Sequence, residues 1–200
     1  YNLKKKSPLE NIHGIGPQFA KKLGNKGIQN INNLREHINN ADLNEQQKIG
    51  LEYHNNLVKI IGREEALKIK NKISKVLRES DDANLNKLNI YLAGSFASKR
   101  EESKDIDFII ETTDNKLNTK LKLENSNLMA KIIQYLKNKK IIIETFSNGK
   151  LKFMGIGRLS KNKPNRHIDI ILTNENMFQF AWLYFTSGVD FNKIIRESAK

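Results

Sequence analysis

Apolar residues recur at two different spacings in the second part of the chain. Strand-like runs cover residues 88–93, 106–111, 141–146, 150–157 and 167–172. Residues 64–77, before the first of these runs, and residues 125–136, between two of them, carry apolar side chains three or four positions apart, which is the spacing of one helix face. Asn148-Gly149 between two of the strand-like runs predicts a hairpin turn. The pattern predicts an α+β domain in which helices pack on a mixed sheet.

The first part of the chain shows helical patterns alone, through residues 17–23, 28–38 and 44–61. Before them stands the sequence LENIHGIGP, in which Gly14 and Gly16 permit a tight turn and Pro17 suits the first turn of a helix. This predicts a helix-hairpin-helix. Free N–H groups at the start of such a helix can bind a DNA phosphate without reading the base sequence. An ordinary glycine-proline turn is the alternative.

The charge of the chain favours a polyanionic partner. It contains 35 basic and 22 acidic residues among 200, a formal net charge of +13. Nucleic acid and an anionic membrane surface both fit such a charge. No apolar run reaches the roughly 20 residues that cross a bilayer, and the absence of cysteine excludes disulfide and thiolate chemistry. We expect an intracellular protein that is not secreted, nuclear or, if viral, located in the cytoplasm or virion.

Two carboxylates stand close together in the stretch LAGSFASKREESKDIDFII, residues 92–110. Asp105 and Asp107 are two positions apart in a predicted strand, so their side chains share a face and repel each other. A divalent cation relieves this repulsion, and Mg²⁺ is bound by one or two carboxylates together with substrate phosphates. Gly94-Ser95 upstream offers close backbone approach and a hydroxyl for a phosphate. The alternative is a solvated D-x-D on an edge strand.

A third carboxylate, Asp169, stands alone between apolar neighbours in the strand-like run 167–172. Burying a lone charge is costly. Its position is explained if this strand lies beside the one that carries Asp105 and Asp107, so that all three belong to one metal site.

The chain resembles the family X DNA polymerases of the beta type over nearly its full length. These enzymes are nucleotidyltransferases. The segments that carry the resemblance are residues 11–17, 43–51, 63–65, 94–96, 105–107, 152–155, 168–170 and 184–186. Gly-Ser with D-x-D is common to many nucleotidyltransferases. The hairpin sequence, together with Tyr184-Phe185-Thr186 and a following asparagine, is more specific.

The resemblance implies a role for each matching residue. Asp105, Asp107 and Asp169 would be catalytic and bind two Mg²⁺, for which Mn²⁺ could substitute. The backbone carbonyls of Glu10, Ile12 and Ile15 would bind Na⁺ or K⁺ at the hairpin. Nucleotide-binding positions would be Arg63, Gly94, Ser95, Ser98, Lys104, Tyr184, Phe185, Gly188 and Asn192. DNA-binding positions would be Gly14, Gly16, Lys152 and Arg196.

The chain departs from the family at the phosphate-binding segment. Ser98 stands where the family has a phosphate-binding arginine, and Lys104 where it has a glycine. Lys99, Arg100 and Lys104 could substitute electrostatically. Ser187-Gly188 reverses the family's Gly-Ser.

The sequence predicts three regions. Residues 1–62 would form the helix-hairpin-helix subdomain, 63–180 the nucleotidyltransferase palm, and 181–200 the truncated start of a subdomain that binds the nascent base pair. The first residue is Tyr and the chain stops inside a helical pattern, so we expect an excerpt of a longer protein. The family's amino-terminal lyase domain and most of its carboxy-terminal subdomain are absent from this excerpt.

The predicted activity is template-directed, gap-filling DNA synthesis in base excision repair. The primer 3′-hydroxyl would attack the α-phosphorus of a dNTP and release pyrophosphate. The expected partners are gapped or primer-template DNA and dNTP. We expect a monomer that binds no membrane. The alternatives are a template-independent terminal transferase, an RNA-tailing nucleotidyltransferase, and a non-catalytic helix-hairpin-helix DNA-binding module.

Overall fold

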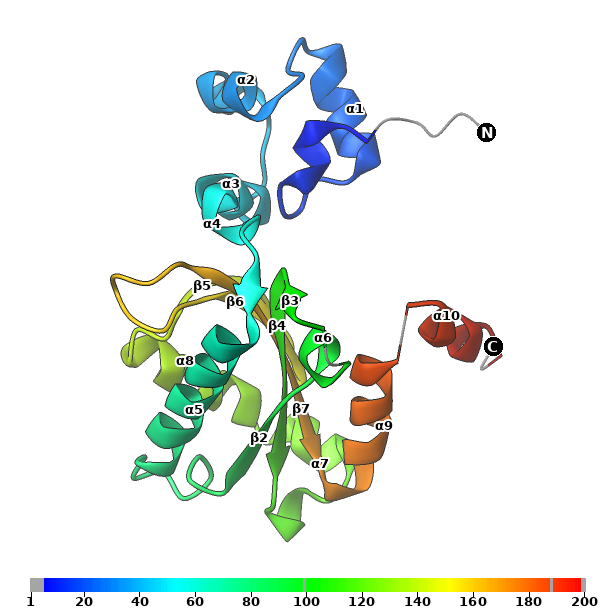
Figure 1. Ribbon diagram of the computed structural model, residues 1–200. Helices are drawn as coiled ribbons and strands as arrows, with labels where there is room; N and C mark the ends of the chain where they lie inside the picture. Colours follow the sequence, from blue (N-terminus) through cyan, green and yellow to red (C-terminus); the bar gives the residue numbers. More distant parts are fainter. Residues whose placement is uncertain (1–5, 99, 188, 199–200) are drawn as a thin grey trace. The chain divides into compact units, whose positions relative to one another are not determined.

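The computed structural model describes residues 6–98, 100–187 and 189–198 (Figure 1). The chain divides into two compact units, residues 1–59 and 60–200. The sequence placed this boundary after Gly62. Ile61 and Gly62 belong to the second unit because they form strand β1, which pairs with Ser103 and Glu102 of β3.

The helices of the first unit are η1 Pro8–Asn11, α1 Pro17–Asn25, α2 Ile31–Glu36, η2 Ile38–Asn40, α3 Glu45–Glu52 and α4 His54–Leu57. The strands of the second unit are β1 Ile61–Gly62, β2 Leu88–Leu92, β3 Glu102–Ser103, β4 Asp105–Thr112, β5 Ile142–Asn148, β6 Lys152–Gly157 and β7 Arg166–Asn174. Its helices are α5 Arg63–Arg78, α6 Gly94–Ala97, η3 Asn115–Leu117, α7 Lys120–Asn125, α8 Leu128–Asn138, α9 Glu175–Thr186 and α10 Val189–Ser198. None of the described helices is long and apolar enough to cross a membrane.

The first unit is built around a tight turn between η1 and α1. Gly14 has a φ of +83°, a conformation that favours glycine. Gln47 of α3 is buried, and its Nε2 donates to the Gly14 carbonyl at 3.0 Å. Gly50 of the same helix lies against the His13 backbone, where an added Cβ would stand 2.4 Å from the carbonyl oxygen. Helix α3 therefore fixes the conformation of the turn.

The second unit contains a five-stranded sheet in the order β2-β4-β7-β6-β5. Strands β4 and β7 are parallel, and the other neighbours are antiparallel. The sheet is therefore mixed, and the predicted α+β class is confirmed. Helices α5 and α8 cover one face of the sheet, and α9 contacts β4 and β7 (Figure 1).

Alternation along β4 and β7 gives the sheet two different faces. The core beneath α5 and α8 contains Ile106, Phe108 and Ile110 of β4, with Ile168 and Ile170 of β7, all at most 2% exposed. The intervening positions of the same strands carry the carboxylates on the opposite face. One set of strands thus supplies both the core and the acidic face.

Two predicted helices differ from the helices of the structure. The helix expected over 125–136 corresponds to α8, which begins only at Leu128 because Asn127 adopts a left-handed φ of +54°. The preceding helix α7 lies almost wholly outside the expected range. The pattern over 44–61 is divided into α3, α4 and strand β1. The hairpin between β5 and β6 is present, and its turn is closed by the Gly149 N–H bonding to the Lys152 carbonyl at 2.8 Å.

Candidate active site

The three carboxylates come together through the parallel pairing of β4 and β7. In this register Asp107 stands opposite Asp169, and Asp105 stands opposite His167. Adjacent strands lie about 4.8 Å apart, so residues 62 positions apart in the sequence become neighbours. The D-x-D spacing placed two carboxylates on one face, and the strand pairing adds the third.

The three carboxylates affect one another electrostatically. Burial, together with the charges of Asp105 and Asp169, raises the pKa of Asp107 to about 7. Burial is also the main cause that raises the pKa of Asp169 to about 6, and Asp105 contributes in the same direction. The Lys152 ammonium opposes both shifts. Negative charge is therefore costly here unless a cation compensates it.

Glycine is required above Asp107. Gly94 has a φ of +54°, and a Cβ added to it would stand 1.8 Å from Asp107 Oδ2. The neighbouring Ala93 N–H donates to the Asp107 carbonyl at 2.9 Å. The backbone before Ser95 is thus held directly against one of the carboxylates, which brings the expected phosphate-binding residue and the acidic face together.

The carboxylates do not form a closed metal cage. Among the described residues, no group of three or more His, Cys, Asp and Glu side chains is arranged to hold a metal ion. Asp105 Oδ1 accepts from the Ser103 hydroxyl at 3.0 Å, which turns it toward its own segment. His167 Nε2 lies 3.6 Å from Asp169 Oδ1, and burial lowers the pKa of that histidine.

The donor set nevertheless fits a hard divalent cation. Three carboxylates from two neighbouring strands supply only oxygen ligands, which are the ligands that Mg²⁺ prefers. Asp169 Oδ1 is buried and has no hydrogen-bond partner in the described part of the chain. An oxygen of this kind is costly to bury unless a cation or a donor reaches it.

Arg63, an expected nucleotide-binding residue, is bonded to the backbone of residues that follow Ser95. Its Nη1 donates to the carbonyls of Phe96 and Arg100 at 2.8 and 3.1 Å, and its guanidinium lies 4.0 Å from the centre of the Phe96 ring. These contacts hold the side chain against α6 and the residues that follow it. Arg63 therefore joins the start of α5 to α6 and to Arg100.

Ser98 and Lys104 differ in their surroundings. Ser98 Oγ donates to the Gly94 carbonyl at 3.1 Å and to the Thr186 carbonyl at 3.5 Å, so it closes the end of α6. Lys104 is exposed and lines a hollow of about 380 Å³ together with Ser95 and Asp105. Lys99 and Gly188 lie outside the described residues.

The expected sugar and base-pair residues lie at the α9–α10 end of the unit. Tyr184 is 45% exposed and meets Phe185 edge-on, with ring centroids 5.8 Å apart. Asn192 Nδ2 donates to the Tyr184 carbonyl at 2.7 Å, across the junction between the helices. Arg196 lies in α10, and its side chain is outside the described part.

The hairpin residues belong to the first unit. Gly16 is the exposed N-cap of α1, where no side chain caps the first N–H groups. The Ile12 carbonyl accepts from the Ile15 N–H at 3.1 Å, while the Glu10 side chain bonds to the Ser7 N–H at 2.9 Å. The turn therefore presents backbone groups and few charged side chains.

Two features of the site were not predicted from the sequence. Ser103 stands two residues before Asp105 and bonds to it, a local spacing that could have been noticed. The buried Arg166 donates two bonds of 2.8 Å to the Glu65 carboxylate, joining the start of β7 to α5. No local signal connects residues that lie 101 positions apart.

The chain matches two protein-family models. Residues 60–175 match the DNA polymerase beta palm, and residues 8–58 match the fingers domain of DNA polymerase lambda. The first match contains all three carboxylates, and the second contains the hairpin.

Similar proteins include DNA polymerase lambda of Rattus norvegicus, 26% identical over 96% of this chain, and of Arabidopsis thaliana, 23% identical over 92%. The chain spans about one third of the length of these relatives, 32% and 34%. Among solved structures, the polymerase beta of Leishmania infantum, crystallised as a ternary gap complex, matches with a TM-score of 0.85 and 26% identity. That match covers 100% of this chain and 69% of the other.

Proposed function

Because the chain belongs to the family X DNA polymerases, we propose that it takes part in template-directed, gap-filling DNA synthesis in repair. The reaction adds a dNMP to a primer 3′-hydroxyl and releases pyrophosphate. The observation that carries the proposal is the pairing of Asp107 with Asp169 across β4 and β7, beneath the Gly94-Ser95 backbone. Acidic ligands and a phosphate-binding segment then meet at one point.

Family X polymerases use divalent metal ions. In this chain Asp105, Asp107 and Asp169 would hold two Mg²⁺, with Mn²⁺ as a substitute. When bound, the ions would supply charge neutralisation and activate the hydroxyl in an in-line displacement. The protein's own contribution is to orient the three carboxylates on a rigid sheet and to hold Ser95 beside them.

The helix-hairpin-helix would bind the DNA backbone. Gly14 and Gly16 add no side chains of their own to the turn, and the uncapped start of α1 offers N–H groups to a phosphate. Carbonyls of Glu10, Ile12 and Ile15 would hold Na⁺ or K⁺ against that phosphate. Lys152 and Arg196 would add further DNA contacts, and Tyr184, Phe185 and Asn192 would lie along the incoming nucleotide.

The short β5–β6 turn separates this proposal from an untemplated transferase. Asn148 pairs with Phe153, and the Gly149 N–H bonds to the Lys152 carbonyl, so the connection is tight. The resemblance implies that terminal transferases carry a long loop that takes the place of a template strand. This hairpin has no such loop, which favours a template-dependent reaction.

Primer extension tests the proposal. The chain is given a one-nucleotide gap and each dNTP in turn, alongside a single-stranded primer without template. We expect addition of the complementary nucleotide at the gap and little addition to the single strand. Efficient untemplated tailing would favour the transferase, while DNA binding without any addition would favour the non-catalytic module. A nuclear, monomeric protein is part of the same proposal, to be checked by light scattering and by localisation of a tagged chain.

A further inference from the structure

The segment after α6 has lost the arginine that the family resemblance places at Ser98. Ser98 bonds to the carbonyls of Gly94 and Thr186 and so serves the local fold. A triphosphate carries about four negative charges, and charge-assisted bonds are the strong ones in phosphate recognition. Another cation must therefore serve this position if the chain binds a nucleotide.

A hollow beside the carboxylates contains such a cation. It has a volume of about 380 Å³, and Ser95, Arg100, Lys104 and Asp105 line it. Pockets for small ligands begin at roughly 300 Å³. Arg100 is exposed, so its guanidinium is available to a ligand without displacing buried contacts. The hollow thus places the expected phosphate-binding hydroxyl and two cations next to an expected metal ligand.

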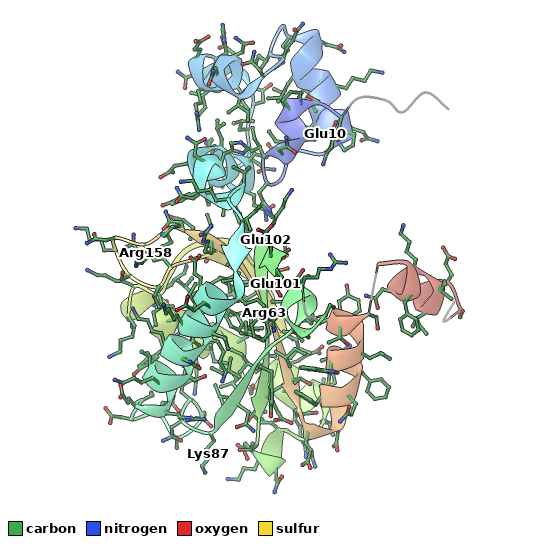
Figure 2. All side chains as sticks on the ribbon, viewed as in Figure 1. Glu10, Arg63, Lys87, Glu101, Glu102 and Arg158 are labelled. Atoms are coloured by element: carbon green, nitrogen blue, oxygen red, sulfur yellow. The ribbon has the colours of Figure 1, made fainter. Side chains whose placement is uncertain are left out.

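The backbone of Arg100 is fixed at both of its polar groups. Its N–H donates to the Ser95 carbonyl at 3.1 Å, and its carbonyl accepts from Arg63 Nη1 at 3.1 Å. The same Nη1 donates to the Phe96 carbonyl at 2.8 Å. Arg63 therefore ties both α6 and Arg100 to the start of α5. Figure 2 shows Arg63 in this region, near Glu101 and Glu102.

We propose that Arg100 binds the triphosphate of the incoming nucleotide and that Arg63 is a positioning residue that holds Arg100 in place. The inference rests on the proposed polymerase function and names the residue that replaces the family's arginine. Arginine suits the role because its planar fork can bond two phosphate oxygens at once. Lys104 adds a second positive charge, whereas Glu102, which lines the same hollow, opposes an anionic ligand.

Titration calorimetry tests Arg100 without requiring catalysis. Inorganic tripolyphosphate and dATP are titrated into the full chain at one fixed Mg²⁺ concentration, and deoxyadenosine serves as the uncharged reference. Arg100→Ala should weaken tripolyphosphate and dATP binding about 10- to 100-fold, as expected for a lost charge-assisted bond. Deoxyadenosine binding should not change. Glu102→Gln should strengthen tripolyphosphate binding several-fold, because it removes a like charge from the hollow.

Arg78→Ala is the matched control. Arg78 is an exposed arginine at the far end of α5, about 22 Å along the helix from Arg63, so this variant loses the same charge away from the hollow. It should bind tripolyphosphate nearly as the wild type does. A loss as large as that of Arg100→Ala would mean that net charge alone is being measured, and would overturn the assignment of Arg100.

Arg63 is tested by a double-mutant cycle. Arg63→Gln should weaken tripolyphosphate binding and raise the KM for dNTP more than it lowers kcat, while Arg63→Lys should restore part of the affinity. In an Arg100→Ala background, Arg63→Gln should have little further effect, because it acts through Arg100. Thermal unfolding shows whether each variant is folded, and if Arg63→Gln is not, Arg63→Lys replaces it in the cycle. Additive losses would overturn the positioning role.

The outcomes separate this inference from the proposed function. If Arg100→Ala binds tripolyphosphate as tightly as the wild type does, the inference is contradicted, whatever primer extension shows. Tripolyphosphate binding that depends on Arg100, in a chain that extends no primer, contradicts the polymerase proposal and supports the anion-binding role. A wild-type chain that binds neither tripolyphosphate nor dATP contradicts both.

Discussion

The two units present their expected functional groups in different ways. In the first unit the hairpin offers backbone groups, and its conformation depends on Gly14 and on close contact between Gly50 and His13. In the second unit the acidic face offers side-chain charge, assembled across β4 and β7. A backbone site is sensitive to added volume, whereas a carboxylate site is sensitive to charge.

Removing one charge from the acidic face should have the largest effect. We expect Asp169→Asn to lower primer extension about 10³-fold or more, comparable to the loss of a strong electrostatic contact in other active sites. Binding of gapped DNA should remain nearly unchanged, because the carboxylate serves the reacting groups and not the duplex. Single-turnover extension and an equilibrium DNA titration measure the two effects. Near-normal turnover would refute the three-carboxylate assignment.

The acidic face should also make stability depend on pH. The folded pKa of Asp107, about 7, lies above its ordinary value of 3.8, so folding takes up a proton between these values. Stability in EDTA should therefore fall as the pH rises from 4 to 8, by up to about 4 kcal/mol. Asp107→Asn should flatten this dependence and stabilise the chain at pH 8. Denaturant unfolding at several pH values measures the free energy of unfolding. If it depends on pH as steeply in the variant as in the wild type, titration of Asp107 is not the cause.

The aromatic pair at the end of α9 should control sugar choice. We expect Phe185→Gly to reduce the preference for dNTP over rNTP by about 10²-fold, because the bulky ring excludes a 2′-hydroxyl by shape. Phe185→Leu keeps most of the bulk and should keep most of the preference. The ratio of kcat/KM for the two nucleotides is the measurement. Equal ratios in all three proteins would show that the pair is only a packing element.

Adding volume to the hairpin should have the smallest effect and should not depend on DNA sequence. Gly50→Ala places a Cβ 2.4 Å from the His13 carbonyl oxygen, so the turn must shift. We expect gapped-DNA affinity to fall about 10-fold on every sequence, because phosphate contacts dominate such binding. Gly24→Ala is the control, since its Cβ would meet nothing within 4 Å. If both variants bind equally well, the hairpin is an ordinary turn.

Local patterns were enough for much of the fold. Alternating apolar residues predicted the strands, and the spacing of Asp105 and Asp107 placed them on one face. They were not enough where a single residue changes the backbone direction. Asn127, with its positive φ, delays the start of the helix expected over 125–136 to Leu128. The pattern over 44–61 gave no indication that Ile61 leaves the helix to pair with Ser103.

The sequence by itself determined the family, the α+β class and the glycine turn of the hairpin, and it proposed three carboxylates as candidate ligands, because these depend on local spacing and on motifs of a few residues. Tertiary structure decided which groups meet. It placed Asp169 opposite Asp107, committed Arg63 to the carbonyls of Phe96 and Arg100, and joined Arg166 to Glu65. Each of these contacts joins residues more than 30 positions apart, and strand register and helix packing, which set such contacts, are not encoded in any short stretch of the chain.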